Sequence, residues 1–351
     1  FPVPNINLDA LGSALAAQPN QSNATENGLR SLLGRVTYNF NEKYLLTVTT
    51  RYDGSSKFAE GNKWGLFPSA AFAWRLGEEG FIKDIEAVSS AKLRASYGQS
   101  GNEQIPTDQS ISSYDFSTYN FQNEGPQSGV ALNRLDNPDL TWETTTQIDL
   151  GFELGLFNDR VYLNFDAYKK NTKDLLLAVP VPFTTGFATS FQNLGEVENR
   201  GIELSLTTQN MSRRKFSWST TFNISYNRNE VLNLGEAEEF TVSSIGEHRN
   251  DYIVRVGESL GSYYGFVFDG IYTYQDFVEF DGLDQAQSEA LMAEFDRAQE
   301  IWFTPKEGIP AKAGVTKFRP GMIKLKDVNG DGVVDPEDRT ILGNSQPDHY
   351  G

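Results

Sequence analysis

The sequence predicts an all-β fold, an antiparallel transmembrane β-barrel with long extracellular loops. Three observations support this fold class. Apolar and polar residues alternate with a period of two along much of the chain, as in strands with one apolar and one polar face. The alternating segments are mostly near the ~9–11 residues that a tilted strand needs to cross a bilayer, whereas globular strands run nearer ~5–6. Long connections occur at every other link, which gathers them at one end of the sheet, as in outer-membrane barrels.

The expected strands are rows of apolar side chains that fall on one face. The opposite face carries a mixture of Thr, Ser, Asn, Gln, Tyr, Asp and Arg, which suits a water-filled lumen better than the Lys- and Glu-rich surface of a soluble sheet. About eight rows are present, at 36–40, 44–48, 64–76, 91–97, 148–154, 161–167, 202–206 and 218–226.

The connections between these rows differ in length according to the end of the sheet on which they fall. The links at 41–43, 157–160 and 210–215 are short. The links at 53–63, 101–143, 171–196 and 229–261 are longer, and they alternate with the short ones. The link at 77–90 falls on the short side but is of medium length. This sorting is typical of a membrane barrel, which has short turns at one end and long loops at the other.

We divide the chain into four regions on this pattern. Residues 1–29 are a loop or the remnant of a strand, and residues 30–228 are transmembrane β-hairpins with extracellular loops. Residues 229–345 form a large extracellular loop region, with a strand near 261–274 and a helix near 284–301 that covers a local core. Residues 346–351 are the start of a further strand.

Composition excludes several classes of function. The chain has 30 basic and 47 acidic residues and a net charge of −17, which argues against a nucleic-acid partner. It has no cysteine, so a cysteine nucleophile is excluded. It has only two histidines, His248 and His349, so histidine-based catalysis is nearly excluded. No window approaches 18 consecutive apolar residues, so no transmembrane helix is expected. We therefore expect a protein that is not an enzyme.

Residues 327–338 have the spacing of a calcium-binding loop. Side-chain oxygens fall at loop positions 1, 3, 5, 9 and 12, a glycine (Gly332) falls at position 6 where the chain turns sharply, and position 7 offers its carbonyl. Position 12 is Asp rather than the usual Glu. The expected ligands of a structural Ca²⁺ are Asp327, Asn329, Asp331, Val333, Asp335 and Asp338. The alternative is an Asp- and Gly-rich turn that is merely solvated.

The long link at 101–143 contains four alternating aromatic residues, Tyr114, Phe116, Tyr119 and Phe121. They are candidates for stacking on the rings of a sugar ligand. The alternative is ordinary packing inside the loop.

Several segments together resemble SusC/RagA-type TonB-dependent outer-membrane transporters of Bacteroidetes. They occur in family order, at 41–47, 51–58, 64–69, 93–98, 101–102, 137–143, 261–265 and 327–343. The resemblance implies that the chain is a segment of a 22-stranded barrel in the outer membrane of a Gram-negative cell. Neither a plug nor a TonB box is visible, so we expect an internal or C-terminal-half fragment.

The resemblance also implies a function. Such transporters take up large nutrients such as glycans or peptides, work with a SusD-like surface lipoprotein as a lid, and draw energy from the TonB-ExbB-ExbD system through their N-terminal part. Membrane lipid and lipopolysaccharide would surround the barrel. The alternative function is that of a soluble, calcium-dependent extracellular β-protein that binds carbohydrate.

Overall fold

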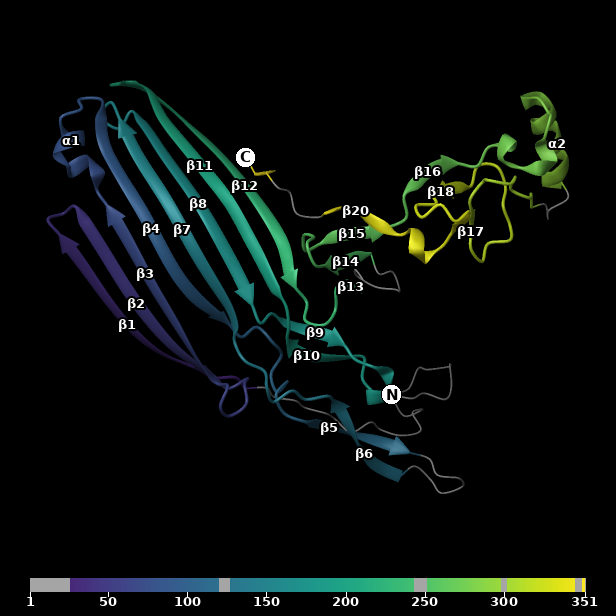
Figure 1. The fold of residues 1–351 in the computed structure, drawn as a ribbon, viewed down its shortest axis with the longest axis horizontal. Helices are drawn as coiled ribbons and strands as arrows, with labels where there is room; N and C mark the ends of the chain where they lie inside the picture. Colours follow the sequence, from purple (N-terminus) through teal and green to yellow (C-terminus); the bar gives the residue numbers. More distant parts are fainter. Residues whose placement is uncertain (1–25, 120–126, 243–250, 298–301, 345–348, 351) are drawn as a thin grey trace, which may run out of the picture.

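One antiparallel sheet dominates the computed structural model, which describes residues 26–119, 127–242, 251–297, 302–344 and 349–350. All eight expected strands are present, each paired with its neighbour along the sheet, and the all-β antiparallel fold class is confirmed (Figure 1). In sheet order the strands are β1 (Leu29–Phe40), β2 (Tyr44–Ser55), β3 (Trp64–Trp74), β4 (Val88–Asn102), β7 (Glu143–Leu156), β8 (Val161–Lys173), β11 (Glu196–Arg213), β12 (Phe216–Asn233) and β21 (His349–Tyr350).

The strand registers place the apolar rows together on one face of this sheet. Leu204, for example, lies opposite Phe165 on one side and Ile224 on the other. These side chains are not covered by the rest of the described chain: Leu32 is 72% exposed and Val36 70% exposed. An apolar face of this size in contact with water is rare in soluble monomers, so the sheet is built to meet an apolar environment.

Aromatic rings border the apolar face at both ends of the strands. At the end with the short turns, Tyr44 stacks between Phe40, Phe72 and Trp74, with ring centroids 6.1–6.4 Å apart. At the other end, Tyr52 stacks on Trp64 at 4.8 Å. Aromatic girdles at the two water interfaces are typical of transmembrane barrels.

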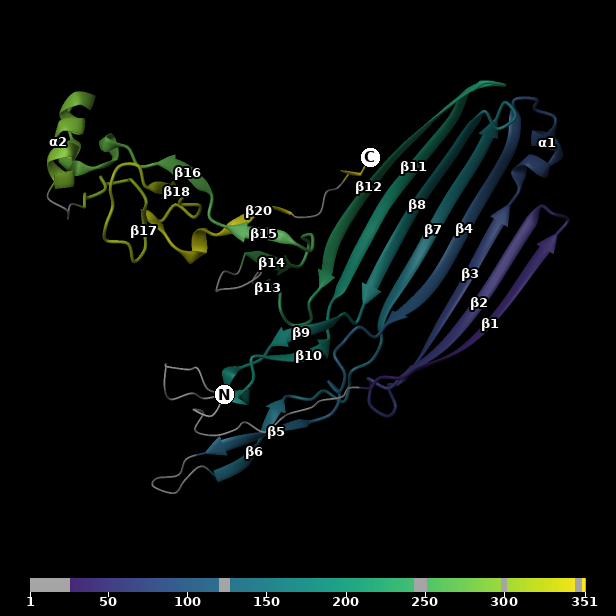
Figure 2. The ribbon, with the colours of Figure 1, turned by 180° about the vertical axis from the view of Figure 1, so that it is seen from behind.

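The long connections lie at one end of the sheet and contain structure of their own. The pairs β5 (Ser113–Tyr119) with β6 (Gln127–Arg134), and β9 (Leu176–Pro180) with β10 (Thr189–Asn193), are hairpins at the end opposite α1 (Gly80–Lys83) (Figures 1 and 2). A short 3₁₀ turn, Phe183–Thr185, lies between β9 and β10. Leu176 of β9 and Phe191 of β10 pack against a buried cluster, which consists of Phe58, Phe67, Ile105, Leu140 and Trp142.

The link of medium length between β3 and β4 is fastened to the first short turn. It contains a 3₁₀ turn, Leu76–Glu78, followed by α1. The carboxylate of Glu79 accepts hydrogen bonds from Lys43 Nζ at 2.9 Å, Tyr44 OH at 2.9 Å and Trp74 Nε1 at 3.2 Å. The hydrogen bond from Lys43, followed by those from Trp74 and Tyr44, lowers the pKa of the Glu79 carboxyl.

The region after β12 is a chain of small sheets rather than one extended loop. β13 (Glu239–Val242), β14 (Tyr252–Arg255), β15 (Ser262–Gly265) and β20 (Thr340–Asn344) form a four-stranded sheet. β16 (Phe268–Ile271) pairs with β18 (Ile323–Leu325), and β17 (Ala311–Lys312) pairs in parallel with β19 (Val333–Val334). Both views show this region beyond the β12 side of the large sheet (Figures 1 and 2).

Three expected boundaries differ from those observed. The single strand near 261–274 is two short strands, β15 and β16, with different partners, and Gly261 and Gly270 have the positive φ that glycine adopts without strain. The helix expected at 284–301 is α2 (Gln285–Arg297), and residues 298–301 lie outside the described chain. The loop region expected from 229 begins later, because β12 continues to Asn233.

α2 borders a second cluster of buried aromatic residues. Its Leu291 and Met292 pack on the cluster as partly buried side chains, as does Tyr274 of the 3₁₀ turn Tyr274–Asp276. The next 3₁₀ turn, Val278–Phe280, contributes a ring to the cluster itself. The members are Tyr272, Phe277, Phe280, Phe303 and Phe318.

The strand expected to start within 346–351 is seen as β21, which pairs with β12 through Ser225 opposite Tyr350 and Tyr226 opposite His349. In the expected N-terminal region 1–29, residues 1–25 lie outside the described chain and β1 begins at Leu29. No helix in the described ranges is long and apolar enough to cross a membrane.

Candidate functional site

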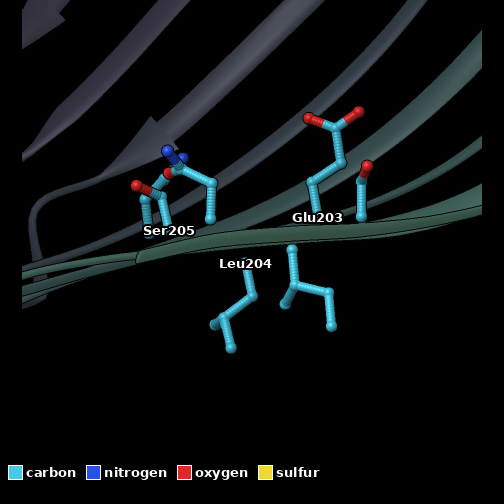
Figure 3. A pocket seen from close by; sticks show the side chains of 7 residues that line it. Glu203, Leu204 and Ser205 are labelled. Atoms are coloured by element: carbon cyan, nitrogen blue, oxygen red, sulfur yellow. The ribbon is translucent and has the colours of Figure 1, made fainter. Parts of the chain in front are cut away.

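The polar face of the large sheet is the candidate functional site. Figure 3 shows the side chains of Glu203 and Ser205 on one side of the ribbon and that of Leu204 on the other. This alternation follows from the pleat of the strand, which directs successive side chains to opposite faces. A shallow hollow on this face is lined by the polar side chains Asn164, Glu203, Ser205, Asn223 and Ser225.

A charged network lies on the same face of β4, β7 and β8. Arg94 Nη2 lies 2.8 Å from Asp166 Oδ1 and 2.9 Å from Asn164 Oδ1. Lys92 Nζ lies 3.3 Å from Glu153 Oε1, and Tyr162 OH donates to Glu153 Oε2 at 3.0 Å. The sequence placed these residues on the polar face, but it gave no register from which their pairing could be found.

Gly151 makes room for this network. A Cβ at residue 151 would lie 2.5 Å from Asp166 Oδ1 and 2.8 Å from Arg94 Cζ. The absence of a side chain at this position of β7 therefore lets an arginine of β4 reach an aspartate of β8 across the intervening strand.

The long-loop end of the polar face is partly covered by the segment after β12. Val197 and Val231 fall on the polar-face register but are buried, in a cluster with Leu234. Phe240 and Val254 pack against them. The covering segment is also hydrogen-bonded, since Leu260 N donates to Asn229 Oδ1 at 2.8 Å.

The predicted calcium loop is a compact turn in whose first half three of the expected ligands accept hydrogen bonds from the loop's own backbone amides. Asp327 accepts from Gly330 N at 2.6 Å and from Gly332 N at 2.7 Å. Asn329 Nδ2 donates to Asp331 Oδ2 at 3.3 Å, and Val333 N donates to Asp331 Oδ1 at 2.8 Å. These hydrogen bonds hold the backbone of the first half of the loop in a compact turn.

The two remaining carboxylates have different surroundings. Asp335 caps the 3₁₀ turn Pro336–Asp338 by accepting from Glu337 N at 2.8 Å. Asp338 is fully buried and accepts from Asp335 N at 2.8 Å, Val328 N at 2.7 Å and Asn329 N at 3.2 Å. The bond from Asp335, with smaller contributions from the other two amides and from Asp327, lowers the pKa of the Asp338 carboxyl against the opposing effect of burial.

No group of three or more His, Cys, Asp or Glu side chains converges in a metal-binding arrangement anywhere in the described ranges. Two of the expected donors, the side-chain amide of Asn329 and the backbone carbonyl of Val333, belong to neither the acidic nor the imidazole class of ligand. The calcium site therefore stays a prediction.

The four aromatic candidates fall in or beside the β5–β6 hairpin. Tyr114 is 63% exposed and pairs in register with Leu132. The backbones of Phe116 and Tyr119 lie in β5. Phe121 lies outside the described residues. Sugar binding at this hairpin stays a prediction.

Comparison with known proteins identifies the family of this fold. A family model described as "TonB dependent receptor-like, beta-barrel" matches residues 3–288. The chain belongs to this TonB-dependent receptor family. TonB-dependent receptor P3 of Formosa agariphila is 35% identical over 340 residues, which cover 96% of this chain and 31% of that protein. TonB-dependent receptor SusC of Bacteroides thetaiotaomicron is 32% identical over 274 residues, which cover 74% and 26%.

A solved structure of a RagA-type importer is also similar to this chain. The RagAB peptide importer in its closed-closed state matches with a TM-score of 0.64 and 26% identity, over 74% of this chain and 28% of the matched chain. The SusC/RagA resemblance of the sequence is confirmed. The chain spans about a third of the length of the curated relatives that it matches, and those relatives are named as receptors rather than enzymes.

Proposed function

We propose that this chain is the barrel part of an outer-membrane, TonB-dependent importer of large nutrients such as glycans or peptides. The observation that carries the proposal is the two-faced sheet. It has an exposed apolar face, bordered on β2 and β3 by aromatic rings at both ends, and a polar face that includes Arg94 and Glu203. The apolar face suits the lipid of a Gram-negative outer membrane. The polar face suits a water-filled passage.

Partners follow from the family rather than from contacts in this chain. The SusC/RagA likeness supports a SusD-like surface lipoprotein that closes the long-loop end as a lid. It also supports energy supply by the TonB-ExbB-ExbD system through the part of the full-length protein that precedes the barrel. The name of the RagAB peptide importer favours peptides as one substrate class, and the name SusC leaves glycans open.

Localisation and uptake in cells carrying the full-length gene test the proposal. The protein is expected in the outer-membrane fraction, to need detergent for extraction, and to migrate anomalously on unheated gels. Growth on the imported polymer is expected to fail when either this gene or the TonB gene is deleted. Recovery of the natural protein as a monomer in plain buffer would refute the membrane role and favour the soluble, calcium-dependent carbohydrate-binding alternative.

We also propose that residues 327–338 bind one structural Ca²⁺. The donor set supports this, because carboxylates, an amide oxygen and a carbonyl are the hard ligands that Ca²⁺ prefers. Asp327 accepts hydrogen bonds from two backbone amides and Asp331 accepts one from a backbone amide. A carboxylate has about four lone-pair sites, so both side chains keep lone pairs that can face an ion.

Calorimetric titration of the full-length protein with calcium tests this site. We expect saturable binding that Asp331→Ala abolishes and that Glu337→Gln, a change inside the loop but outside the ligand set, leaves intact. Flat titration at millimolar calcium would exclude the site. Loss of binding in both variants would show that loop folding, rather than ligation by Asp331, is responsible.

A further inference from the structure

A row of three cations crosses the apolar face of the sheet near its long-loop end. In register, Arg200 of β11 lies opposite Lys169 of β8 on one side and Arg228 of β12 on the other. The adjacent row on the same face, two residues along each strand, is apolar and consists of Ala167, Ile202 and Tyr226. The outward face therefore changes from apolar to cationic within one repeat of the pleat.

The charged ends of these three side chains are accessible. The side chains of Lys169, Arg200 and Arg228 are 59%, 53% and 52% exposed. Two carboxylates, those of Glu198 and Glu230, lie in the next row of the same face toward the long-loop end, and their side chains are only 11% and 29% exposed. The three cations are therefore the more accessible members of the cluster.

The carboxylates do not satisfy the two guanidinium groups. Lys169 Nζ lies 2.8 Å from Glu198 Oε2. Arg200 is 4.0 Å from Glu198 and 3.7 Å from Glu230, and Arg228 is 3.7 Å from Glu230, all beyond hydrogen-bond length. Three cations beside two carboxylates leave an excess of one positive charge, and the arginine donors can bind a further anion through two parallel hydrogen bonds.

The level of the row along the strand is that of lipid head groups. Arg228 is ten positions from Trp218 at the short-turn end of β12. At ~3.3 Å per residue and a tilt of about 40° this spans roughly 25 Å, the height of the apolar band of a transmembrane barrel. Basic side chains at this level can extend from the apolar band into the head-group layer.

The charge is local to this side of the barrel wall. At the same end of β2 and β3 the border of the apolar face is the Tyr52–Trp64 stack. On β7 the residue in register with Lys169 is Ile148. A cationic border of three adjacent strands, in a chain of net charge −17, fits a localised anionic ligand rather than general attraction to the membrane.

We propose that Lys169, Arg200 and Arg228 form a binding site for the phosphate groups of an anionic lipid in the leaflet on the long-loop side. The site rests on the proposed membrane location of the sheet. The acyl chains of the lipid would lie along the apolar row of Ala167, Ile202 and Tyr226. The phosphates would meet the guanidinium and ammonium groups above it.

Binding of defined lipids to the full-length protein in nanodiscs tests the site. The probes are bis-phosphorylated lipid A, the same lipid without its phosphates, and inorganic phosphate in solution. The test variant is Lys169→Gln/Arg200→Gln/Arg228→Gln. The matched control is Lys170→Gln, which removes a cation from the polar face of the same strand β8.

Wild-type protein and the Lys170→Gln control are expected to prefer the phosphorylated lipid. The triple variant is expected to bind it roughly a hundredfold more weakly, since each cation near an anionic surface contributes about fivefold. Equal binding by wild type and triple variant would overturn the site, as would binding of inorganic phosphate as tight as that of the lipid. Heat-dependent gel migration of the same samples reports membrane folding separately, so failure of the barrel proposal is distinguishable from failure of the lipid site.

Discussion

At the scale of single residues, the polar face depends on close approaches that only small residues permit. Gly151 lies on β7, between β4 and β8. Arg94 of β4 and Asp166 of β8 form an ion pair across this position, with Nη2 and Oδ1 2.8 Å apart. Both side chains of this ion pair are partly exposed, so we expect the pair to contribute modestly to stability and mainly to fix the position of Arg94.

We expect Gly151→Ala to disrupt this ion pair, because the new methyl group would lie within 2.8 Å of both partners. The free energy of unfolding of the full-length protein should fall by at most about 1 kcal/mol, because the atoms that must move are the ends of two side chains rather than backbone. Urea unfolding from lipid vesicles measures it. Gly34→Ala is the matched control, since its Cβ would meet only Thr50 Cγ2, at 3.7 Å. Equal loss in both variants would contradict a specific role for Gly151.

A second prediction at this scale concerns pH at the short-turn end. The lowered pKa of Glu79 means that its hydrogen bonds stabilise the link fully above the ordinary carboxyl pKa of about 4.3. That stabilisation is lost as pH falls through the lowered pKa of the folded state. The protection factors for hydrogen exchange at Ile82 and Lys83, whose amides donate to the backbone carbonyl of Glu79, should therefore fall in acid when each rate is compared with the intrinsic exchange rate at the same pH.

In Glu79→Gln the protection factors of these two amides should already be low at neutral pH and should no longer fall in acid. Glu78→Gln, which removes the neighbouring and more exposed carboxylate, should behave as wild type. Acid dependence that persists in Glu79→Gln would assign the effect to another group.

At the scale of strands, the two faces of β11 should tolerate different substitutions. Leu204 points to the apolar face and Ser205 to the polar face, as Figure 3 shows. Leu204→Arg is expected to cost about 2–4 kcal/mol in folding stability, because the charge would lie in the hydrocarbon layer. Ser205→Arg should cost far less, since it faces water. Folding from urea into vesicles measures both, and similar costs would contradict the assignment of faces.

The centres of the strands were predictable from the sequence, but their ends were not. The rows at 202–206 and 218–226 lie within β11 and β12, which extend to Glu196 and Asn233. Beyond the apolar band the outward side chains are charged, as at Arg200 and Glu230, so the two-residue contrast disappears although backbone pairing continues. The β5–β6 and β9–β10 hairpins lie inside segments that were expected to be loops, although Tyr114 and Phe116 alternate along β5.

Pairings between distant segments also escaped the sequence. β15 and β20 lie side by side although about 75 residues separate Gly265 from Thr340. The Arg94–Asp166 pair depends on two strand registers at once. Neither the spacing nor the type of these residues indicates the pairing, whereas the local spacing of residues 327–338 was enough to predict a compact loop.

At the scale of the whole molecule, the sheet has one face that suits lipid and one face that suits water. On β2 and β3 its apolar face ends in aromatic rings at both borders, and its polar face is partly covered at the long-loop end by the segment that packs on Val197 and Val231. The chain accounts for about a third of the length of its relatives, so the proposed transport requires the rest of the full-length protein.

The most direct test of the membrane sheet is accessibility along β11. The chain contains no cysteine, so single thiols can be placed in turn at residues 202–207 and spin-labelled in the full-length protein in lipid vesicles. We expect collision with oxygen to peak at 202, 204 and 206, and collision with a water-soluble nickel complex to peak at 203, 205 and 207. Uniform access of the nickel complex to all six positions would contradict the account, because a sheet in water would expose both of its faces.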